Sequence, residues 1–124
     1  MLPWESFGPD GRPLTFRIID DVYTIRWTDE IWTRATNCDG WVTYQPPVIC
    51  VSTHLSPMRL AQVFTHEIVH AILKALDPDK TTYTIEEVCH AASFLATVWM
   101  DNPDVFRWLE GVLATARTPL VHPR

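Results

Sequence analysis

The chain of 124 residues predicts an α+β fold, in which a small antiparallel sheet packs against about three helices. Segments rich in β-branched and aromatic residues fill the first part of the chain, up to residue 51. Segments with helical spacing of apolar residues fill the remainder. Because no repeat, linker or low-complexity segment separates the two parts, we expect a single domain, which is long enough to bury a hydrophobic core.

The strands are predicted within residues 14–51. Residues 1–13 are rich in proline and glycine and are expected to form an arm that lies on the domain. Thr15–Ile19 and Val22–Trp27 then predict two strands joined at a pair of aspartates, because apolar and polar residues alternate in the second segment.

A hairpin is predicted next, with Trp41–Tyr44 and Val48–Val51 as its strands. The connection, Gln45–Pro47, contains two prolines, which suit a loop because proline cannot donate a hydrogen bond to a sheet. The backbone near Val48–Ser52 is a candidate edge for pairing with an extended peptide.

The first predicted helix spans residues 57–76. Ser56 is placed to cap it, Pro57 occupies the first helical position, and Asp77 followed by a proline ends it. This segment is apolar nearly all round, which predicts a buried helix. Polar side chains inside such a helix need partners, because burying them unpaired is costly.

This helix carries an HExxH motif, formed by His66, Glu67 and His70. Two histidines four residues apart lie on one helix face, where both rings can reach one metal ion. The glutamate between them is placed to take a proton from a metal-activated water. The alternative is a surface helix, in which both histidines are solvated and Glu67 pairs with Lys74 or Arg59.

A second helix is predicted over residues 84–100 and offers the third metal ligand. A catalytic zinc site normally has three protein ligands and an open position. Glu87 is the first choice, since its flank of the helix is apolar and a carboxylate there needs a partner. Two alternatives stay open: a role for Glu87 only as the capping-box partner of Thr84, and Glu86 as the ligand. His90 is expected at the surface.

The last helix is predicted over residues 103–116, with an apolar stripe facing the core. The six tryptophans divide into two groups. Trp27, Trp41 and Trp99 fall on predicted core faces, whereas Trp4, Trp32 and Trp108 are candidates for exposure.

Charge and composition limit the classes of binding partner that we expect. The net charge is −5 and the basic residues form no stripe, so we expect no nucleic-acid partner. Apolar stretches are too short to span a bilayer, and the N-terminus has no signal-peptide pattern. The three cysteines lack ligand spacing and are expected to be reduced thiols in a cytoplasmic protein. The oligomeric state stays open.

The motif His66–His70, followed by Glu86–Val88 at the start of the next helix, resembles small gluzincin-type zinc metallopeptidases. The resemblance covers about residues 14–100 and is closest to compact phage- and prophage-encoded metallopeptidases, and more distant to the ImmA/IrrE-type peptidases. It implies a minigluzincin-like fold, in which a β-hairpin precedes the motif helix and Glu87 is the third ligand. Val88 departs from the alanine usual in the ImmA/IrrE group, and the metzincin extension after His70 is absent.

The predicted function is therefore a zinc-dependent peptidase acting on a peptide or protein substrate. His66, His70 and Glu87 would bind Zn²⁺, and Glu67 would be the general base. The alternatives are a non-catalytic zinc-containing binding module on the same fold and a hydrolase of a non-peptide amide or ester. The presence of Glu67 favours catalysis, because a structural site needs no base.

A hydrogen-bond donor for the developing oxyanion is expected besides the metal. Tyr83, His54 and His90 are the candidates, and the sequence does not rank them.

Overall fold

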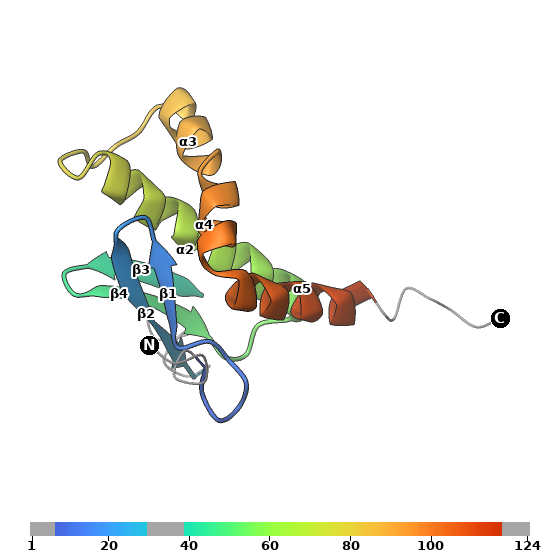
Figure 1. Ribbon diagram of the computed structural model, residues 1–124. Helices are drawn as coiled ribbons and strands as arrows, with labels where there is room; N and C mark the ends of the chain where they lie inside the picture. The colour runs from blue at the N-terminus through green and yellow to red at the C-terminus, as the bar shows by residue number, and fades with distance from the viewer. Residues whose placement is uncertain (1–6, 30–38, 118–124) are drawn as a thin grey trace.

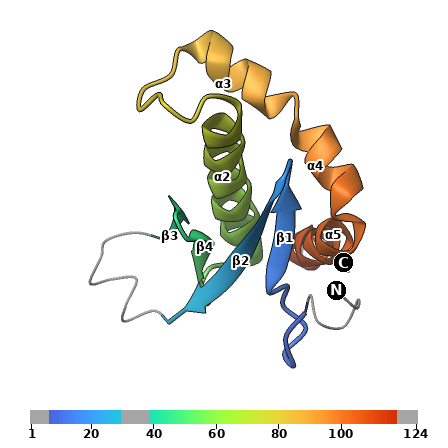
Figure 2. The ribbon, with the colours of Figure 1, turned by 60° about the vertical axis from the view of Figure 1, so that its left-hand side comes forward.

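A computed structural model of the chain shows an α+β domain, and its described part comprises residues 7–29 and 39–117. The elements are β1 (Thr15–Ile18), β2 (Asp21–Thr28), β3 (Gly40–Tyr44), β4 (Pro47–Ser52), α2 (Pro57–Leu76), α3 (Ile85–Ala92), α4 (Leu95–Asp101) and α5 (Pro103–Arg117). Helix α2 lies across one face of the sheet, and α3, α4 and α5 form an arch that returns along it (Figures 1 and 2). The predicted α+β class is confirmed.

The four-stranded sheet is mixed, with the strand order β1-β2-β4-β3. The two predicted antiparallel pairs, β1 with β2 and β3 with β4, are present, but β2 and β4 pair in parallel. The prediction of an entirely antiparallel sheet is therefore wrong. The reason lies in Val48–Val51 of β4, whose side chains are all buried, since a continuously apolar strand is stable only between two neighbours.

The position of β4 also corrects the predicted peptide-binding edge. Val48–Ser52 lies inside the sheet, where β2 and β3 pair with it on either side. The outer strands are β1 and β3.

Helix α2 has the bounds predicted from the sequence, and its first turn shows why. The Ser56 hydroxyl accepts a hydrogen bond from the Arg59 N–H at 3.3 Å, and Pro57 follows the cap. Phe64, Ile68 and Ile72 are fully buried. These three side chains anchor α2 in the core below the sheet.

The helix predicted over residues 84–100 is interrupted, so that α3 ends at Ala92 and α4 begins at Leu95. At the break, the Ser93 hydroxyl donates to the His90 carbonyl at 2.5 Å. The interruption lets α3 pack on α2 while α4 turns toward β1. A single straight helix of this length could not pack against both α2 and β1.

The burial of α3 and α4 also differs from the prediction. Helical spacing of apolar residues predicts a buried stripe formed by Ile85, Val88, Cys89, Ala92, Leu95, Ala96 and Trp99. Ile85 is 83% exposed and Trp99 is 44% exposed, whereas Ala91 and Val98 are fully buried. The two helices therefore bury the flank on which Glu87 was placed from the sequence, and much of the predicted stripe faces solvent.

The junction of α4 and α5 is held to β1 by Asn102, which is 8% exposed. Its amide nitrogen donates to the carbonyls of Arg17, at 2.6 Å, and Val98, at 2.8 Å, and its side-chain oxygen accepts from the Arg17 N–H at 2.6 Å. Helix α5 begins directly after it, near the predicted start. The three hydrogen bonds satisfy the buried amide and fix the end of the arch on the sheet.

An aromatic cluster joins α2, α5 and β2. Trp108 makes edge-to-face contacts with Trp27, at 5.8 Å between ring centroids, and with Phe64, at 6.1 Å. Trp108 is thus part of the packed interior, which corrects its predicted exposure, and the exposed Trp99 corrects its predicted burial. Trp4, Trp32 and Cys38 lie outside the described residues.

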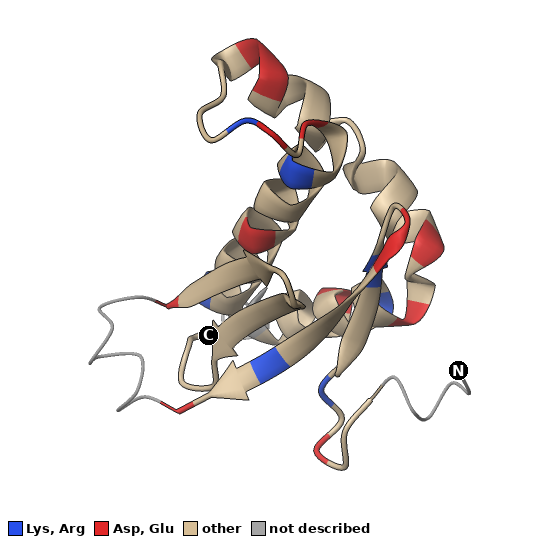
Figure 3. Cartoon of the chain, turned by 90° about the vertical axis from the view of Figure 1, so that its left-hand side faces the viewer, with Lys and Arg blue, Asp and Glu red and all other residues tan. Residues whose placement is uncertain are grey.

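Charged side chains are spread over the surface (Figure 3). Lys and Arg occur at separate positions on the strands and helices rather than in a continuous stripe. Over the described ranges, no helix combines the length and the apolar character needed to cross a membrane.

Candidate functional site

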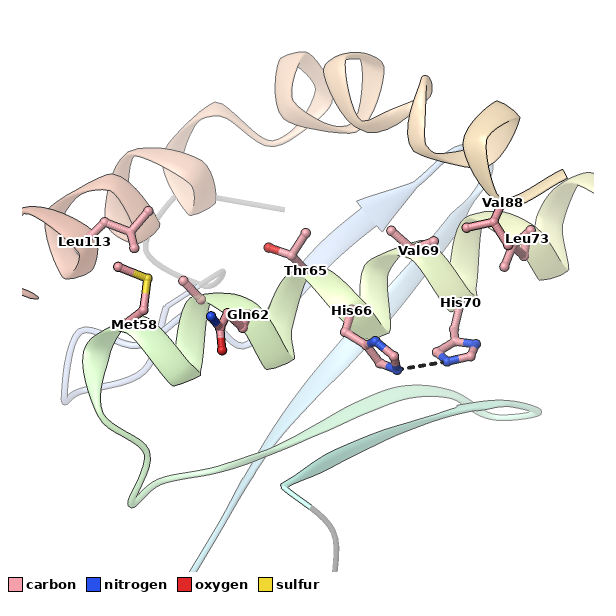
Figure 4. Close-up of a pocket in the computed structure, with 10 residues that line it drawn as sticks. Met58, Gln62, Thr65, His66, Val69, His70, Leu73, Val88 and Leu113 are labelled. Carbon is pink, nitrogen blue, oxygen red and sulfur yellow. Dashed lines mark hydrogen bonds between the residues drawn. The ribbon is translucent and has the colours of Figure 1, made fainter. Parts of the chain in front are cut away.

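His66 and His70 face each other on α2. Their Nε2 atoms are 3.1 Å apart, and the ring centroids are 4.7 Å apart. Figure 4 shows both rings projecting from the same side of the helix. Both histidines are exposed, which corrects the expectation that the apolar helix buries them. Helix α2 buries its opposite side against the core, so the two histidine rings face solvent.

Glu67 is the buried member of the motif, with 6% of its surface exposed. It lies on the side of α2 that packs against β3, close to Gly40. A Cβ atom at Gly40 would stand 2.6 Å from Val63 Cγ1, 2.8 Å from the Cys50 carbonyl oxygen and 3.7 Å from Glu67 Cγ. Only glycine therefore fits at this position of β3, because a side chain would overlap Val63 and the Cys50 carbonyl, and Glu67 lies at ordinary contact distance beside them.

The role of Gly40 was not found from the sequence. An aspartate followed by glycine, as at Asp39 and Gly40, is typical of a turn, whereas the close approach of β3 to α2 is a tertiary contact.

Burial shifts the proton affinities of two motif residues. The pKa of Glu67 is raised by desolvation, an effect that the neighbouring His66 partly offsets. The pKa of His70 is lowered, first by desolvation and then by His66. Glu67 is thus a stronger base than a solvated glutamate, and His70 favours the neutral imidazole that binds metals.

Tyr44 is a further residue near the site that sequence reasoning missed. It lies on the same face of β3 as Gly40, two pleats along the strand. The Lys74 ammonium lies 5.2 Å from the centre of its ring, and burial raises the pKa of its phenol, with smaller contributions from Tyr83 and Glu67. The alternation of β3 is the signal that could have placed Tyr44 beside the motif helix.

Glu87 is held locally on α3. Its carboxylate accepts a hydrogen bond from the Thr84 N–H at 2.9 Å and pairs with the Lys80 ammonium, while the Thr84 hydroxyl accepts from the Glu87 N–H at 3.1 Å. The Lys80 contact and then the Thr84 backbone lower the pKa of Glu87 to about 2. The capping box that was the alternative role for Glu87 is therefore present.

The structure brings His66, Glu67 and His70 together, but it does not bring the α3 candidates into the same group. Glu86, Glu87 and His90 line a separate cavity of about 330 Å³, and Leu73 lines both this cavity and the one beside the histidines. Within residues 7–29 and 39–117, no group of three His, Cys, Asp or Glu side chains is close enough to hold a metal ion.

The three candidates for the oxyanion donor have other contacts. The Tyr83 hydroxyl donates to the Lys80 carbonyl at 3.1 Å, His54 is exposed in the turn before α2, and the His90 ring packs on Phe94. None of the three lines the cavity that contains His66 and His70.

That cavity is a groove of about 670 Å³ along α2, shown in Figure 4. Val88 of α3 and Leu113 of α5 complete its wall, and most of its lining is apolar. The two histidine rings are thus accessible from a groove large enough for part of a substrate.

The histidine pair fits a zinc ion. Two nitrogen ligands at the usual zinc distance in a tetrahedral site are separated by about 3.3 Å. The observed 3.1 Å between the Nε2 atoms of His66 and His70 is close to that value. Two of the three protein ligands expected at a catalytic zinc site are therefore suitably placed. The third would have to come from a carboxylate such as Glu87.

Comparison with known proteins identifies a family for the chain. A family model for the IrrE N-terminal-like domain, Peptidase M78, matches residues 31–97, which is more than half of the chain. No curated protein and no solved structure shows significant similarity. The match includes the motif helix and α3, and it supports a metallopeptidase-like function for the domain. The chain belongs to the IrrE N-terminal-like domain family of peptidases.

Proposed function

We propose that this protein is a zinc-dependent peptidase of the gluzincin type, which hydrolyses peptide bonds in peptide or protein substrates in the cytoplasm. The observation that carries the proposal is the 3.1 Å separation of the His66 and His70 Nε2 atoms beside the buried Glu67. Family membership supports it independently, because the matched domain belongs to a peptidase family.

His66 and His70 would hold the metal through Nε2 as neutral imidazoles, and Glu87 would complete the protein ligands, with Glu86 as the alternative. When bound, zinc supplies Lewis-acid activation of a water molecule and of the substrate carbonyl. The ordinary pKa of a glutamate, 4.5, already keeps the Glu87 carboxylate ionised at neutral pH, the form that a ligand requires. To serve as a ligand, Glu87 must give up its contact with Lys80.

Glu67 would act as the general base. Its carboxylate accepts a proton from water as the water oxygen attacks the carbonyl carbon of the scissile bond. The same proton passes to the leaving nitrogen as the carbon–nitrogen bond breaks, which regenerates the carboxylate. The burial that raises the pKa of Glu67 suits both transfers, since a base with a pKa nearer neutral takes up and returns a proton readily.

The proposal is tested by metal content and turnover. Purified protein should contain about one zinc ion per chain, as expected for a site with three protein ligands. His66→Ala should lose the metal and the activity, whereas Glu67→Gln should keep the metal and lose turnover. His54→Ala is the matched control, because His54 is an exposed histidine outside the groove, and it should keep both. A wild-type protein without metal would contradict the proposal.

The third ligand is tested by comparing two neighbouring glutamates. Glu87→Gln should weaken zinc binding by at least about tenfold, since even the loss of a supporting contact costs about 10–100-fold in metal affinity. Glu86→Gln should bind zinc as the wild type does. The reverse result would assign the role to Glu86.

A second candidate function is a non-catalytic binding module on the same fold. One observation favours it: the Glu87 carboxylate is already engaged by Lys80 and Thr84. If Glu67→Gln and the wild type behave alike on a broad peptide library, this second function is the correct one.

A further inference from the structure

A second large cavity lies toward the end of α2, and it shares no lining residue with the groove of the histidines. Its volume is about 650 Å³. Its polar lining comes from β2, from the end of β3 with the turn that follows, and from α2, and consists of Asp21, Tyr23, Tyr44, Gln45 and Lys74. We call this space the polar cavity. Four of these five side chains can donate a hydrogen bond, which favours a ligand that accepts hydrogen bonds.

Lys74 supplies the positive charge of the polar cavity. Its ammonium lies 5.2 Å from the centre of the Tyr44 ring. Such a cation–π contact orients the ammonium and leaves N–H groups available for an acceptor. Over residues 7–29 and 39–117, Lys74 forms no ion pair, either with Asp21 or with another carboxylate. The ammonium can therefore attract an anion into the cavity.

Tyr23 supplies a hydroxyl from inside the core. The residue is 3% exposed, and its hydroxyl has no hydrogen-bond partner among the described residues. In that part of the chain no side-chain oxygen or nitrogen is both fully buried and unpaired, so the hydroxyl reaches the cavity that Tyr23 lines. The pKa of Tyr23 is raised to about 12, first by burial and then by Asp21 and Tyr44, which indicates that these groups lie close together. The hydroxyl is thus placed to donate to a ligand.

The polar cavity lies in line with the two histidines. Lys74 follows His70 by four residues, so it stands on the same face of α2, one turn or about 6 Å farther along. The pKa of Tyr44 is raised first by burial and then by Tyr83 and Glu67, so its phenol lies within the electrostatic influence of the motif. An extended peptide advances by about 3.4 Å per residue. A group two residues from a bond held at the histidines would therefore reach Lys74.

The charge balance of the polar cavity favours a carboxylate over a phosphate. One ammonium matches one negative charge, and Asp21 opposes a second. The part of α2 at this cavity is near its C-terminus, where the backbone carbonyls carry a partial negative charge. Phosphate groups instead prefer helix N-termini and the paired donors of arginine, and the cavity lining has neither.

We propose that the polar cavity binds a carboxylate group of the substrate, about two residues from the scissile bond. Lys74 neutralises the charge, and the hydroxyls of Tyr23 and Tyr44 donate hydrogen bonds to the carboxylate oxygens. Two sources carry this group: the free C-terminus of a peptide, and the side chain of an aspartate or glutamate. The inference rests on the proposed peptidase function and adds a substrate class to it.

The first test measures binding without turnover, in the Glu67→Gln variant. Aromatic NMR signals of Tyr23 and Tyr44 should shift on addition of Ac-Ala-Ala-Ala-OH but not of Ac-Ala-Ala-Ala-NH₂, which lacks the carboxylate. Ac-Ala-Glu-Ala-NH₂ distinguishes the two sources, because its carboxylate lies on a side chain. Inorganic phosphate should bind more weakly than the free acid.

Substitutions then locate the binding. Lys74→Met should weaken binding of the free acid by at least about tenfold, and Tyr23→Phe by about tenfold, since a hydrogen bond to a charged group is among the stronger ones. Lys80→Met is the matched control, because Lys80 is the other lysine of the chain and does not line the cavity. Tyr23→Phe keeps the buried ring, so it tests the cavity even if Lys74→Met fails to fold.

The second test is cleavage by the zinc-loaded protein. A peptide with a carboxylate two residues from the scissile bond should be cut with a kcat/KM at least about tenfold higher than its amide counterpart. Lys74→Met should abolish this preference. Arg107→Met should retain it, because Arg107 is an exposed cation on α5 that does not line the cavity.

The outcomes separate the two ideas. Cleavage without a preference for the carboxylate, or binding that Lys74→Met and Tyr23→Phe leave unchanged, would overturn the carboxylate site and leave the peptidase intact. Phosphate that binds as tightly as the free acid would also overturn it. Binding of the free acid that depends on Lys74, in a protein that cleaves no peptide, would support the site and remove the proposed function.

Discussion

Helices α2 and α3 both carry candidate metal ligands, but they are held in different ways. Helix α2 is 20 residues long and has nine buried residues, including Glu67. Helix α3 has eight residues, of which only Ala91 is buried. The HExxH half of the site therefore lies on a helix that is anchored in the core, whereas the glutamate half lies on a short helix with little burial.

The difference teaches how the candidate site is built. His66, Glu67 and His70 are positioned by global packing, because α2 contacts the sheet and α5 along its length. Glu87 is positioned by local contacts with Thr84 and Lys80. Changes in α2 should thus affect the whole fold, and changes in α3 should affect one helix.

The largest contrast is expected from truncating one apolar side chain on each helix. Phe64 of α2 is fully buried, so Phe64→Ala should lower the free energy of unfolding by about 3–5 kcal/mol. Ile85 of α3 is 83% exposed, so Ile85→Ala should change it by no more than about 0.5 kcal/mol. Urea denaturation measures both values. Equal losses would mean that α3 is as firmly packed as α2.

The next contrast concerns glycine at the α2–β3 contact. Gly40→Ala should destabilise the fold by about 1–3 kcal/mol, because the added methyl overlaps Val63 and the Cys50 carbonyl. Gly111→Ala is the control in α5, where nothing lies within 4 Å of the added atom. It should stabilise the protein by up to about 1 kcal/mol through helix propensity. Thermal unfolding of the two variants should move in opposite directions, and a tolerated Gly40→Ala would show that β3 does not pack tightly against Val63 of α2.

A smaller effect is expected from removing the cap of each helix. Ser56→Ala removes the acceptor of the Arg59 N–H, and Thr84→Ala removes the acceptor of the Glu87 N–H. Each loss costs about 1 kcal/mol where the helix forms. Amide hydrogen exchange should show the cost spread over the domain for Ser56→Ala and confined to α3 for Thr84→Ala. Exchange that rises throughout the domain in both variants would remove the distinction between the helices.

The smallest effect concerns the pH dependence of α3. The folded pKa of Glu87, about 2, is below its ordinary value of 4.5, so its contacts stabilise α3 above pH 4.5 and are lost as the pH falls toward 2. Lys80→Met removes the main cause and should raise the pKa of Glu87 toward the ordinary value. Carboxyl NMR titration of the metal-free protein measures the change.

The control for that titration is another exposed ion pair. Arg107 and Asp104 pair at 3.3 Å on α5, and Arg107→Met should leave the pKa of Glu87 unchanged. An unaltered titration of Glu87 in Lys80→Met would show that the ammonium does not hold the carboxylate.

Local patterns predicted much of the fold. The cap and proline at Ser56 and Pro57 define the start of α2, and the alternation in β2 places Tyr23 and Ile25 in the core. The order of the strands was harder to predict. Sequence patterns favour pairing between strands that are adjacent in the chain, and they do not show that β4 lies beside β2. The uninterrupted apolar run at Val48–Val51 was the available sequence signal for an interior strand.

In the candidate site, too, some features follow from local sequence and others depend on packing. The spacing of His66 and His70 determines that their rings meet on one helix face, whatever surrounds the helix. Their exposure, the burial of Glu67 and the contact with Gly40 depend on which side of α2 meets the sheet. These are properties of tertiary packing, and the sequence of one helix alone does not specify them.

The sequence by itself thus determined most of the elements and the meeting of the His66 and His70 rings on one helix face, since turn residues, caps and helical periodicity act over a few neighbouring positions. Only the tertiary structure decided the mixed sheet, the break between α3 and α4, the apolar groove and the partners of Glu87. The physical reason is that these features depend on contacts between segments distant in the chain, or on which of two possible partners one polar side chain binds. Glu87 illustrates that choice, because its capping box was visible in the sequence, whereas its ion pair with Lys80 depends on how the loop before α3 folds back.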